Sequence, residues 1–300
     1  MPSNAPAPGN PPPRIDAALL AQLQTWQGRT ETCCDTFHDA PVRGLSATLD
    51  RDDPAPQAGA PLAPLWHWLY FLPQPRHSGI GPDGHPLRGG FLPPVPLPRR
   101  MWAGGRLHWQ AGNPLRVGDV VERRSCIASV THKAGRTGDL LFVLVRHALH
   151  NAAGLALTEE HDIVYRAAAR PGEPAPAPQA APQDAAWQRV VVPDSVLLFR
   201  YSALTFNGHR IHYDRHYATA AEGYPGLVVH GPLIATLLLD LLRREMPHAV
   251  PAGFAFKAVR PMFDLHPLHL HARPAADGRS VDLWASDPAG GLTMQATATL

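Results

Sequence analysis

Hydrophobic and polar residues alternate over three neighbouring stretches in the first half of the chain, at 120–133, 140–150 and 155–166. Alternation with a period of two residues is typical of strands that bury one face and expose the other. Turns that contain glycine separate the three stretches. The pattern therefore predicts an antiparallel meander, preceded by a helix at 14–28, where apolar residues follow a helical spacing.

The second half has a similar pattern with a longer helix in front of it. Residues 231–244 are apolar around most of a helix's circumference, which predicts a helix buried on nearly all sides. Strands are predicted at 253–263, 269–274 and 281–300. The apolar run at 187–205 also favours a strand.

Segments of the two halves resemble each other. Residues 144–164 and 281–300 both have the pattern strand, small-residue turn, strand, and residues 114–125 parallel residues 260–274. Self-similarity of this kind indicates an internal duplication. A buried helix wrapped by an antiparallel sheet, present twice in one chain, is the arrangement called a double hot dog. We therefore expect an α+β double hot-dog fold.

Proline-rich segments mark the expected domain boundaries. Residues 1–13 are rich in proline and are expected to be disordered, and residues 170–185 have the composition of a linker. The expected parts are the disordered N-terminus (1–13), a first hot-dog domain (14–168), a linker (169–186) and a second hot-dog domain (187–300).

Composition excludes several classes of protein. The net charge of +2 is too small to indicate a nucleic-acid partner. The three cysteines include no CxxC pair, so neither a disulfide framework nor a thiolate zinc site is expected. The N-terminus lacks a signal-peptide pattern, and the longest apolar run, 231–242, is too short to span a bilayer. We expect a cytoplasmic protein without a membrane or nucleic-acid partner.

Four histidines and an asparagine are concentrated in SALTFNGHRIHYDRHYA, residues 202–218, and just after it. The group comprises Asn207, His209, His212, His216 and His230. Histidines at spacings of three and four would form a metal-binding face on a helix. However, Asn207-Gly208 predicts a loop, and no acidic or thiolate fourth ligand is close in sequence, so no metal is expected.

Several segments resemble the MaoC-like hydratases and dehydratases. In the second half these are 202–218, 228–233 and 290–300, and in the first half 91–107, 114–119, 133–147 and 159–166. The most similar branch is that of the hydroxyacyl-thioester dehydratases type 2 and the mesaconyl-C4-CoA or itaconyl-CoA hydratases. The resemblance covers roughly residues 15–300 and implies that the second half carries catalysis.

The resemblance implies roles for three residues. His212 is the candidate acid/base, because imidazole titrates near neutral pH, although a histidine bonded to backbone in the core is the alternative. Asn207 stands where the wider family has an aspartate. Because a carboxamide cannot accept a proton, Asn207 is expected to orient the water. Gly231 opens the predicted helix, and its backbone N–H is expected to stabilise an enolate oxygen, the alternative being an ordinary tight turn.

Substrate-binding candidates come from both halves. Arginine suits carboxylates and phosphates, and Arg99, Arg100 and Arg106 flank Gly104-Gly105, where the backbone can approach a ligand. A solvated turn rich in arginine is the alternative. The full set of candidates is Arg99, Arg100, Arg106, His209, Tyr213 and Arg260.

The expected function is that of a hydro-lyase. By resemblance it adds water to a short dicarboxyl CoA thioester, mesaconyl-C4-CoA or itaconyl-CoA, to give citramalyl-CoA. No cofactor is expected, since CoA is part of the substrate, and the expected assembly is a monomer or a homodimer. A 3-hydroxyacyl-thioester dehydratase of fatty-acid metabolism, a non-catalytic acyl-thioester binding protein and a thioesterase remain alternatives.

Overall fold

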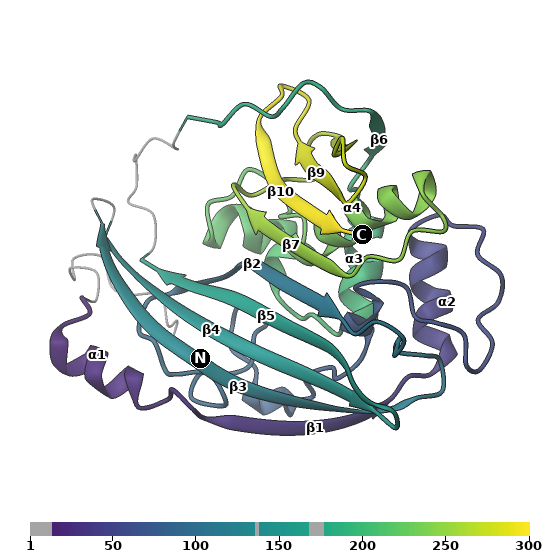
Figure 1. The fold of residues 1–300 in the computed structure, drawn as a ribbon. Coiled ribbons are helices and arrows are strands. Elements are labelled where there is room, and N and C mark those ends of the chain that lie inside the picture. The colour runs from purple at the N-terminus through teal and green to yellow at the C-terminus, as the bar shows by residue number, and fades with distance from the viewer. Residues whose placement is uncertain (1–13, 136–137, 168–176) are drawn as a thin grey trace.

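A computed structural model describes residues 14–135, 138–167 and 177–300 of the chain. The expected disorder at 1–13 lies outside the described residues, as do residues 169–176 of the expected linker. The described residues form one antiparallel sheet of ten strands and four α-helices (Figure 1). The strands are β1 (Thr30–Thr36), β2 (Arg99–Trp109), β3 (Val120–Gly135), β4 (Gly138–Asn151), β5 (Gly154–Arg166), β6 (Trp187–Val191), β7 (Gly253–Ala258), β8 (Leu268–Pro274), β9 (Ser280–Ser286) and β10 (Leu292–Thr299). The α-helices are α1 (Ala17–Gln24), α2 (Asp39–Thr48), α3 (Ser195–Leu204) and α4 (Gly231–Glu245).

The two halves of the sheet have the same strand order. The first five strands are arranged β1-β3-β4-β5-β2, and the last five, counted from the opposite edge, are arranged β6-β8-β9-β10-β7. The hairpin β4–β5 therefore corresponds to the hairpin β9–β10, and β3 corresponds to β8. These are the segments in which the sequence indicated a duplication, and the shared topology confirms it.

Strands β2 and β7 join the two halves edge to edge. Two glycines of β2 make the close approach. A Cβ added at Gly104 would lie 2.5 Å from the Phe256 carbonyl oxygen on β7, and one added at Gly105 would lie 2.9 Å from the Phe256 ring. These glycines therefore serve strand packing. The expectation that a ligand approaches their backbone stays a prediction.

Helix α4 is the central helix of the second half. Every residue from 233 to 242 is buried, and the helix packs against β6, β8, β9 and β10. Pro232 stands in its first turn, where the missing N–H costs no helical hydrogen bond. The expectation of a helix buried on nearly all sides is confirmed.

The apolar run at 187–205 is only partly a strand. Strand β6 ends at Val191, and the run continues as α3, which begins after Asp194. The Asp194 carboxylate accepts a hydrogen bond of 2.8 Å from the Leu197 N–H and caps the helix. The prediction of one strand here is wrong, because periodicity alone does not separate a short buried helix from a strand.

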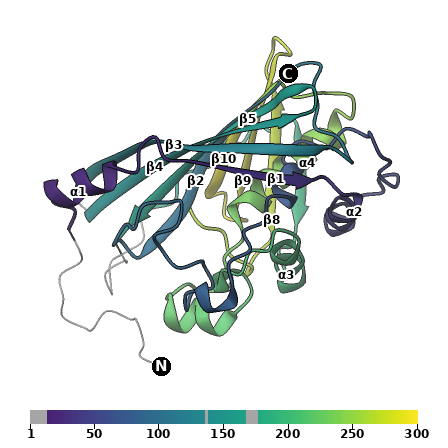
Figure 2. The same ribbon diagram turned by 90° about the horizontal axis from the view of Figure 1, so that it is seen from below.

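The first half departs from the second in its helices. Its helix between the first two strands is α2, in which only Leu45 and Thr48 are buried. Helix α2 lies beside α3 of the second half (Figure 2). The first half adds a second cluster of buried apolar residues beside α1, around Leu23, Ile127 and Leu141. No helix of the described residues is long and apolar enough to span a membrane.

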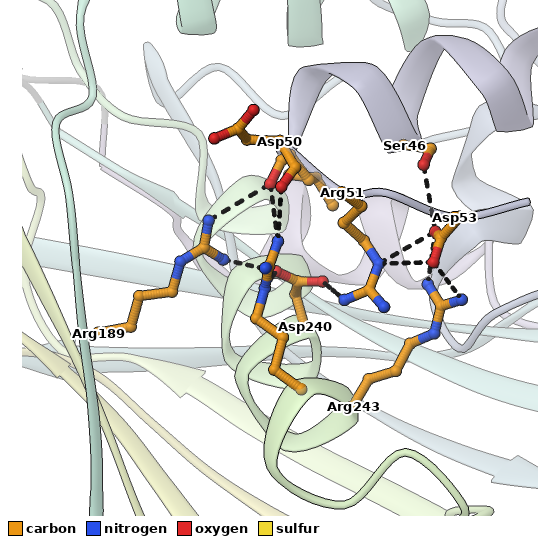
Figure 3. Close-up of polar contacts among 9 residues, drawn as sticks. Ser46, Asp50, Arg51, Asp53, Arg189, Asp240 and Arg243 are labelled. Atoms are coloured by element: carbon orange, nitrogen blue, oxygen red, sulfur yellow. Dashed lines mark hydrogen bonds and ion pairs between the residues drawn. The ribbon is translucent and has the colours of Figure 1, made fainter.

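A buried ion-pair network ties α4 to the first half (Figure 3). The Asp240 carboxylate is 2% exposed and accepts hydrogen bonds from three guanidinium groups. The N···O distances are 2.6 Å for Arg51, which follows α2, 2.5 Å for Arg189 on β6 and 2.8 Å for Arg244 on α4. Since a buried carboxylate is costly without partners, this network fixes α4 relative to both halves.

Candidate active site

The segment after α3 is folded into a tight loop that places its histidines. The Asn207 N–H donates to the Ser202 carbonyl oxygen at 2.8 Å, and the Asn207 side-chain oxygen accepts from the His209 N–H at 3.0 Å. An asparagine that bonds the backbone two residues ahead stabilises a turn. The chain then forms a single 3₁₀ turn, Arg210–His212, so the loop predicted at Asn207-Gly208 is confirmed.

The ring of His212 is buried and its tautomer is fixed. Its Nδ1 lies 2.7 Å from the Val228 carbonyl oxygen, which only accepts, so Nδ1 carries the proton and Nε2 has a free lone pair. Burial lowers the pKa of His212 to about 4, against the hydrogen bond to Val228, which raises it. His212 is therefore a neutral imidazole at pH 7 with one nitrogen able to accept a proton.

His230 lies directly against His212. The two rings are stacked, with 3.8 Å between centroids and 18° between planes. His230 Nε2 is 2.8 Å from the Ser202 hydroxyl, whereas its buried Nδ1 has no hydrogen-bond partner within the described residues. Burial and the neighbouring His212 and His209 hold the pKa of His230 well below its usual value. The stack keeps the ring of His212 in one orientation.

Gly231 begins α4 immediately after His230. No other described part of the chain lies within 4 Å of the place where its Cβ would stand, so the space beside it is open. Among the described residues no backbone acceptor is bonded to its N–H. A helix N-terminus carries partial positive charge, so the expected oxyanion role fits this geometry.

A hairpin of the first half packs on this loop, and sequence reasoning missed it. Gly84 has φ +88°, and its added Cβ would lie 1.8 Å from the Gly208 carbonyl oxygen, so the two backbones are in direct contact. The Arg210 N–H donates to the Asp83 carbonyl oxygen at 2.9 Å, and the Arg210 guanidinium donates to that of Pro82 at 3.0 Å. The first half thus holds the histidine loop in place.

The same hairpin brings Asp83 and His85 to His209. His85 Nδ1 lies 3.0 Å from an Asp83 carboxylate oxygen, and the rings of His85 and His209 have centroids 3.9 Å apart. Burial, with His85 and His212 nearby, lowers the pKa of His209 to about 2, and burial also lowers that of His85. Burial opposes the charge of Asp83, but hydrogen bonds from the His85 side chain and backbone hold its pKa well below the usual value.

Metal ligation is one possible use of this group. Asp83, His85 and His209 each offer an atom, and the three atoms lie within 4.8 Å of one another. The hydrogen bond between Asp83 and His85 already accounts for two of these atoms. In the structure Asp83 and His85 form a hydrogen-bonded pair beside His209, and the expectation that the chain binds no metal stays a prediction.

The expected substrate-binding residues fall into two sets. The charge of Arg100 on β2 contributes to lowering the pKa of His85 and His209, and its side chain is hydrogen-bonded to Tyr165. Arg99 lies nearby on β2 but donates to the Glu222 carbonyl oxygen at 3.0 Å, with its guanidinium 5.3 Å from the Tyr224 ring centroid.

Three of these candidates are engaged elsewhere. Arg106 pairs with Asp162 and Glu160 across β2 and β5, and Arg260 pairs with Asp287. Tyr213 is 43% exposed, and its hydroxyl donates to the Gly208 carbonyl oxygen at 2.9 Å. No contact among the described residues joins Arg106 or Arg260 to the histidine group, so the structure gives neither a place in this site.

Known proteins resemble the chain over nearly its whole length. A family model described as hydroxyacyl-thioester dehydratase type 2 matches residues 65–264. Mesaconyl-C(4)-CoA hydratase of Chloroflexus aurantiacus is 48% identical over 283 residues, which cover 93% of this chain and 98% of that protein. The mitochondrial hydroxyacyl-thioester dehydratase type 2 of Schizosaccharomyces pombe is 26% identical, over 79% of this chain and 87% of that protein.

Solved structures show the same fold at low identity. HtdX of Mycobacterium tuberculosis superimposes with a TM-score of 0.61 and 18% identity, over 89% of this chain and 98% of that one. A second protein of this organism, described as having a double hotdog fold, superimposes with a TM-score of 0.55 and 15% identity, over 93% of this chain and 97% of that one. The expected double hot-dog fold is confirmed. The named relatives also confirm the expected hydro-lyase class, and the chain belongs to the hydroxyacyl-thioester dehydratase type 2 family.

Proposed function

We propose that the chain hydrates a short C5 dicarboxyl CoA thioester, with mesaconyl-C4-CoA as the leading substrate and citramalyl-CoA as the product. The observation that carries the proposal is the neutral His212, whose Nδ1–H is fixed on Val228 and whose Nε2 is free. The 48% identity to a mesaconyl-C(4)-CoA hydratase supports this substrate.

The first step is activation of water. Nε2 of His212 takes a proton from a water molecule while the water oxygen bonds to the β-carbon of the thioester. Asn207 holds this water through its side-chain amide N–H groups, because its oxygen is used by the His209 N–H. A carboxamide orients the water without competing for its proton, which leaves His212 as the single base.

The second step places negative charge on the thioester oxygen. As the new C–O bond forms, the double-bond electrons move to the α-carbon and the carbonyl, which gives an enolate. The Gly231 N–H at the start of α4 donates to this oxygen, in the open space beside it. One such donor contributes about 2.7–4 kcal/mol to the transition state.

The third step returns the proton. The imidazolium of His212 protonates the α-carbon, so hydroxyl and hydrogen add to the same face and His212 regains its neutral form. The electrons and protons balance within the substrate, the water and His212. The reaction accordingly needs no cofactor, and CoA takes part only as a component of the substrate.

A second function is favoured by one observation. The relative in Schizosaccharomyces pombe is a hydroxyacyl-thioester dehydratase, and dehydration of a 3-hydroxyacyl thioester is the same reaction run backwards. The two functions differ in the acyl group. A dicarboxyl substrate needs a cation for its free carboxylate, and Arg100, whose charge acts on His85 and His209, is our candidate for it.

Parallel assays test the proposal. Hydration of mesaconyl-C4-CoA and crotonyl-CoA is followed by loss of the enoyl-thioester absorbance. Hydration of itaconyl-CoA, whose methylene double bond is not conjugated to the thioester, is followed by mass spectrometry of the product, and kcat/KM is compared for the three substrates. We expect the dicarboxyl thioesters to be preferred. A preference for crotonyl-CoA would point to the dehydratase of fatty-acid metabolism, and binding without any loss of absorbance would indicate a non-catalytic protein.

A further inference from the structure

The mechanism above leaves one pair of titratable residues in the site without a task. Asp83 and His85 belong to a hairpin of the first half and contact the histidine loop of the second half. The His85 side chain is 24% exposed, so the pair lies at the edge of the site and not in the core.

The hairpin holds His85 in one orientation. The Asp83 carboxylate accepts two hydrogen bonds of 3.0 Å from His85, one from Nδ1–H and one from the backbone N–H. The Gly81 N–H donates to the His85 carbonyl oxygen at 2.7 Å and closes the turn. Because Asp83 only accepts, Nδ1 carries the proton, and Nε2 of neutral His85 is free to take up another.

Charges around His85 make its protonation sensitive to an anion. The groups that act on it are Asp83, which favours the imidazolium, and Arg88 and Arg100, which oppose it together with burial. A charged His85 in turn lowers the pKa of His209 and of His212. A second carboxylate placed here would tip this balance towards imidazolium and would also pair with Arg100.

The proposed substrate brings such a carboxylate to this place. In a mesaconate thioester linked through C4, the free carboxylate is bonded to the β-carbon that the water attacks. It therefore lies next to the water held by His212 and Asn207, on the loop that His209 shares with them. A negative charge on the attacked carbon's substituent opposes attack by an oxygen nucleophile, so neutralising it also assists the chemistry.

We propose that His85, oriented by Asp83, is a specificity-determining residue that binds the free carboxylate of the dicarboxyl thioester together with Arg100. This inference rests on the proposed function. On binding, Nε2 of His85 takes one proton from solvent and donates it in a charge-assisted hydrogen bond to the substrate carboxylate, while Nδ1–H stays on Asp83. No covalent bond changes in this step.

The test compares two substrates in His85→Gln. Glutamine can still donate to Asp83 but cannot become a cation. We expect kcat/KM for mesaconyl-C4-CoA to fall about 10- to 100-fold, the range for one lost charge-assisted hydrogen bond, mainly through KM. Turnover of crotonyl-CoA, which has no free carboxylate, is expected to stay within about twofold. His77→Gln, at an exposed histidine of the same first-half segment, is the control.

The pH dependence of KM is a second measurement on the same variants. Because binding adds a proton to His85, KM of the wild type for mesaconyl-C4-CoA should rise as pH increases, and KM of His85→Gln should stay flat. Asp83→Asn, which removes the charge that favours imidazolium, should behave like His85→Gln. Melting temperatures establish that all variants are folded. If His85→Gln is not folded, His85→Ala replaces it in the same measurements.

The outcomes separate this inference from the proposed function. If the wild type prefers crotonyl-CoA, the proposed function fails. If the wild type prefers mesaconyl-C4-CoA but His85→Gln leaves the ratio of kcat/KM values unchanged, only this inference fails. An equal loss of kcat for both substrates would overturn it in favour of a general acid–base role. Stoichiometric zinc in the purified protein, with activity lost on chelation, would overturn it in favour of a metal site.

Discussion

His212 and His230 are stacked ring on ring, 3.8 Å apart, in the core of the second half. Each side chain has its own hydrogen-bond partner, the Val228 carbonyl oxygen for His212 and the Ser202 hydroxyl for His230. Because neither ring can rotate without losing a buried hydrogen bond, Nε2 of His212 has one direction in which it can meet a water molecule. The stack also places His212 next to the start of α4, since Gly231 follows His230 directly.

Replacing His212 tests its role as the base. In His212→Gln we expect kcat to fall about 10²- to 10⁴-fold, the usual contribution of general acid–base catalysis, with little change in KM. Since only neutral His212 accepts a proton, kcat/KM of the wild type should fall as pH drops through about 4, the pKa of this ring in the free protein. Steady-state kinetics over pH check both, and an unchanged kcat would remove His212 from the mechanism.

The buried histidines also link stability to pH. The pKa values of His209, His212 and His147 are lowered from 6.5 to about 2, 4 and 3, so the unfolded chain binds more protons than the folded one in acid. The stability they contribute is present above about pH 6.5 and is lost as pH falls from there towards these values. Urea unfolding at pH 7.5 and pH 5 should give a lower free energy at pH 5. A higher value at pH 5 would contradict neutral buried rings.

His230 is expected to position His212 rather than to react. In His230→Ala the stacked partner is lost, and a misplaced base typically costs about 10- to 100-fold in kcat. His230→Phe retains an aromatic face against His212 and should keep more of the activity than His230→Ala. Activity measurements on the two variants, with thermal melts as controls, check this order. If His230→Phe is the more impaired, a nitrogen of His230 takes part in the chemistry.

One added methyl group can break the contact between the first-half hairpin and the histidine loop. Gly84→Ala would place a methyl group 1.8 Å from the Gly208 carbonyl oxygen and should displace the loop of His212. Gly89→Ala is a matched control, because Gly89 has a similar φ of +97° but open space around it. We expect both variants to lose stability from backbone strain, Gly84→Ala to lose more because of the clash, and only Gly84→Ala to lose most of its activity. Equal activities would show that the contact does not support the site.

Asp240 is expected to be a main support of α4. Asp240→Asn leaves Arg51, Arg189 and Arg244 without their shared carboxylate, and breaking a buried ion pair costs about 3–5 kcal/mol. Asp39→Asn, which removes an exposed pair with Arg43, should cost about 0–1 kcal/mol. Chemical denaturation of both variants measures these values, and a small effect of Asp240→Asn would show that the network is not needed for stability.

The sequence predicted features that local patterns encode. The meander of β3, β4 and β5 and the buried helix α4 follow from periodicity, and the duplicated topology follows from the repeated hairpins. The histidine loop was found because its residues are close together in the chain. Predicting these features requires no information about contacts between segments that are far apart in the sequence.

The missed parts depend on contacts between distant segments. His85 is a single histidine in a loop rich in proline and glycine, and only folding brings it to His209, 124 positions later. Its local signal was the sequence Asp83-Gly84-His85, which is typical of a tight turn but says nothing about a partner. Likewise, the sequence around Arg106 is compatible with a ligand-binding arginine, but folding places Arg106 against Glu160 and Asp162 on β5, with which it pairs.

Hydration of mesaconyl-C4-CoA in water enriched with heavy oxygen tests the central claim most directly. We predict that the wild type produces citramalyl-CoA with one heavy oxygen in its new hydroxyl group, and that His212→Gln produces almost none in the same time. Mass spectrometry of the product distinguishes the outcomes. Heavy oxygen in a free carboxylate together with released CoA would show thioester hydrolysis and would contradict the account.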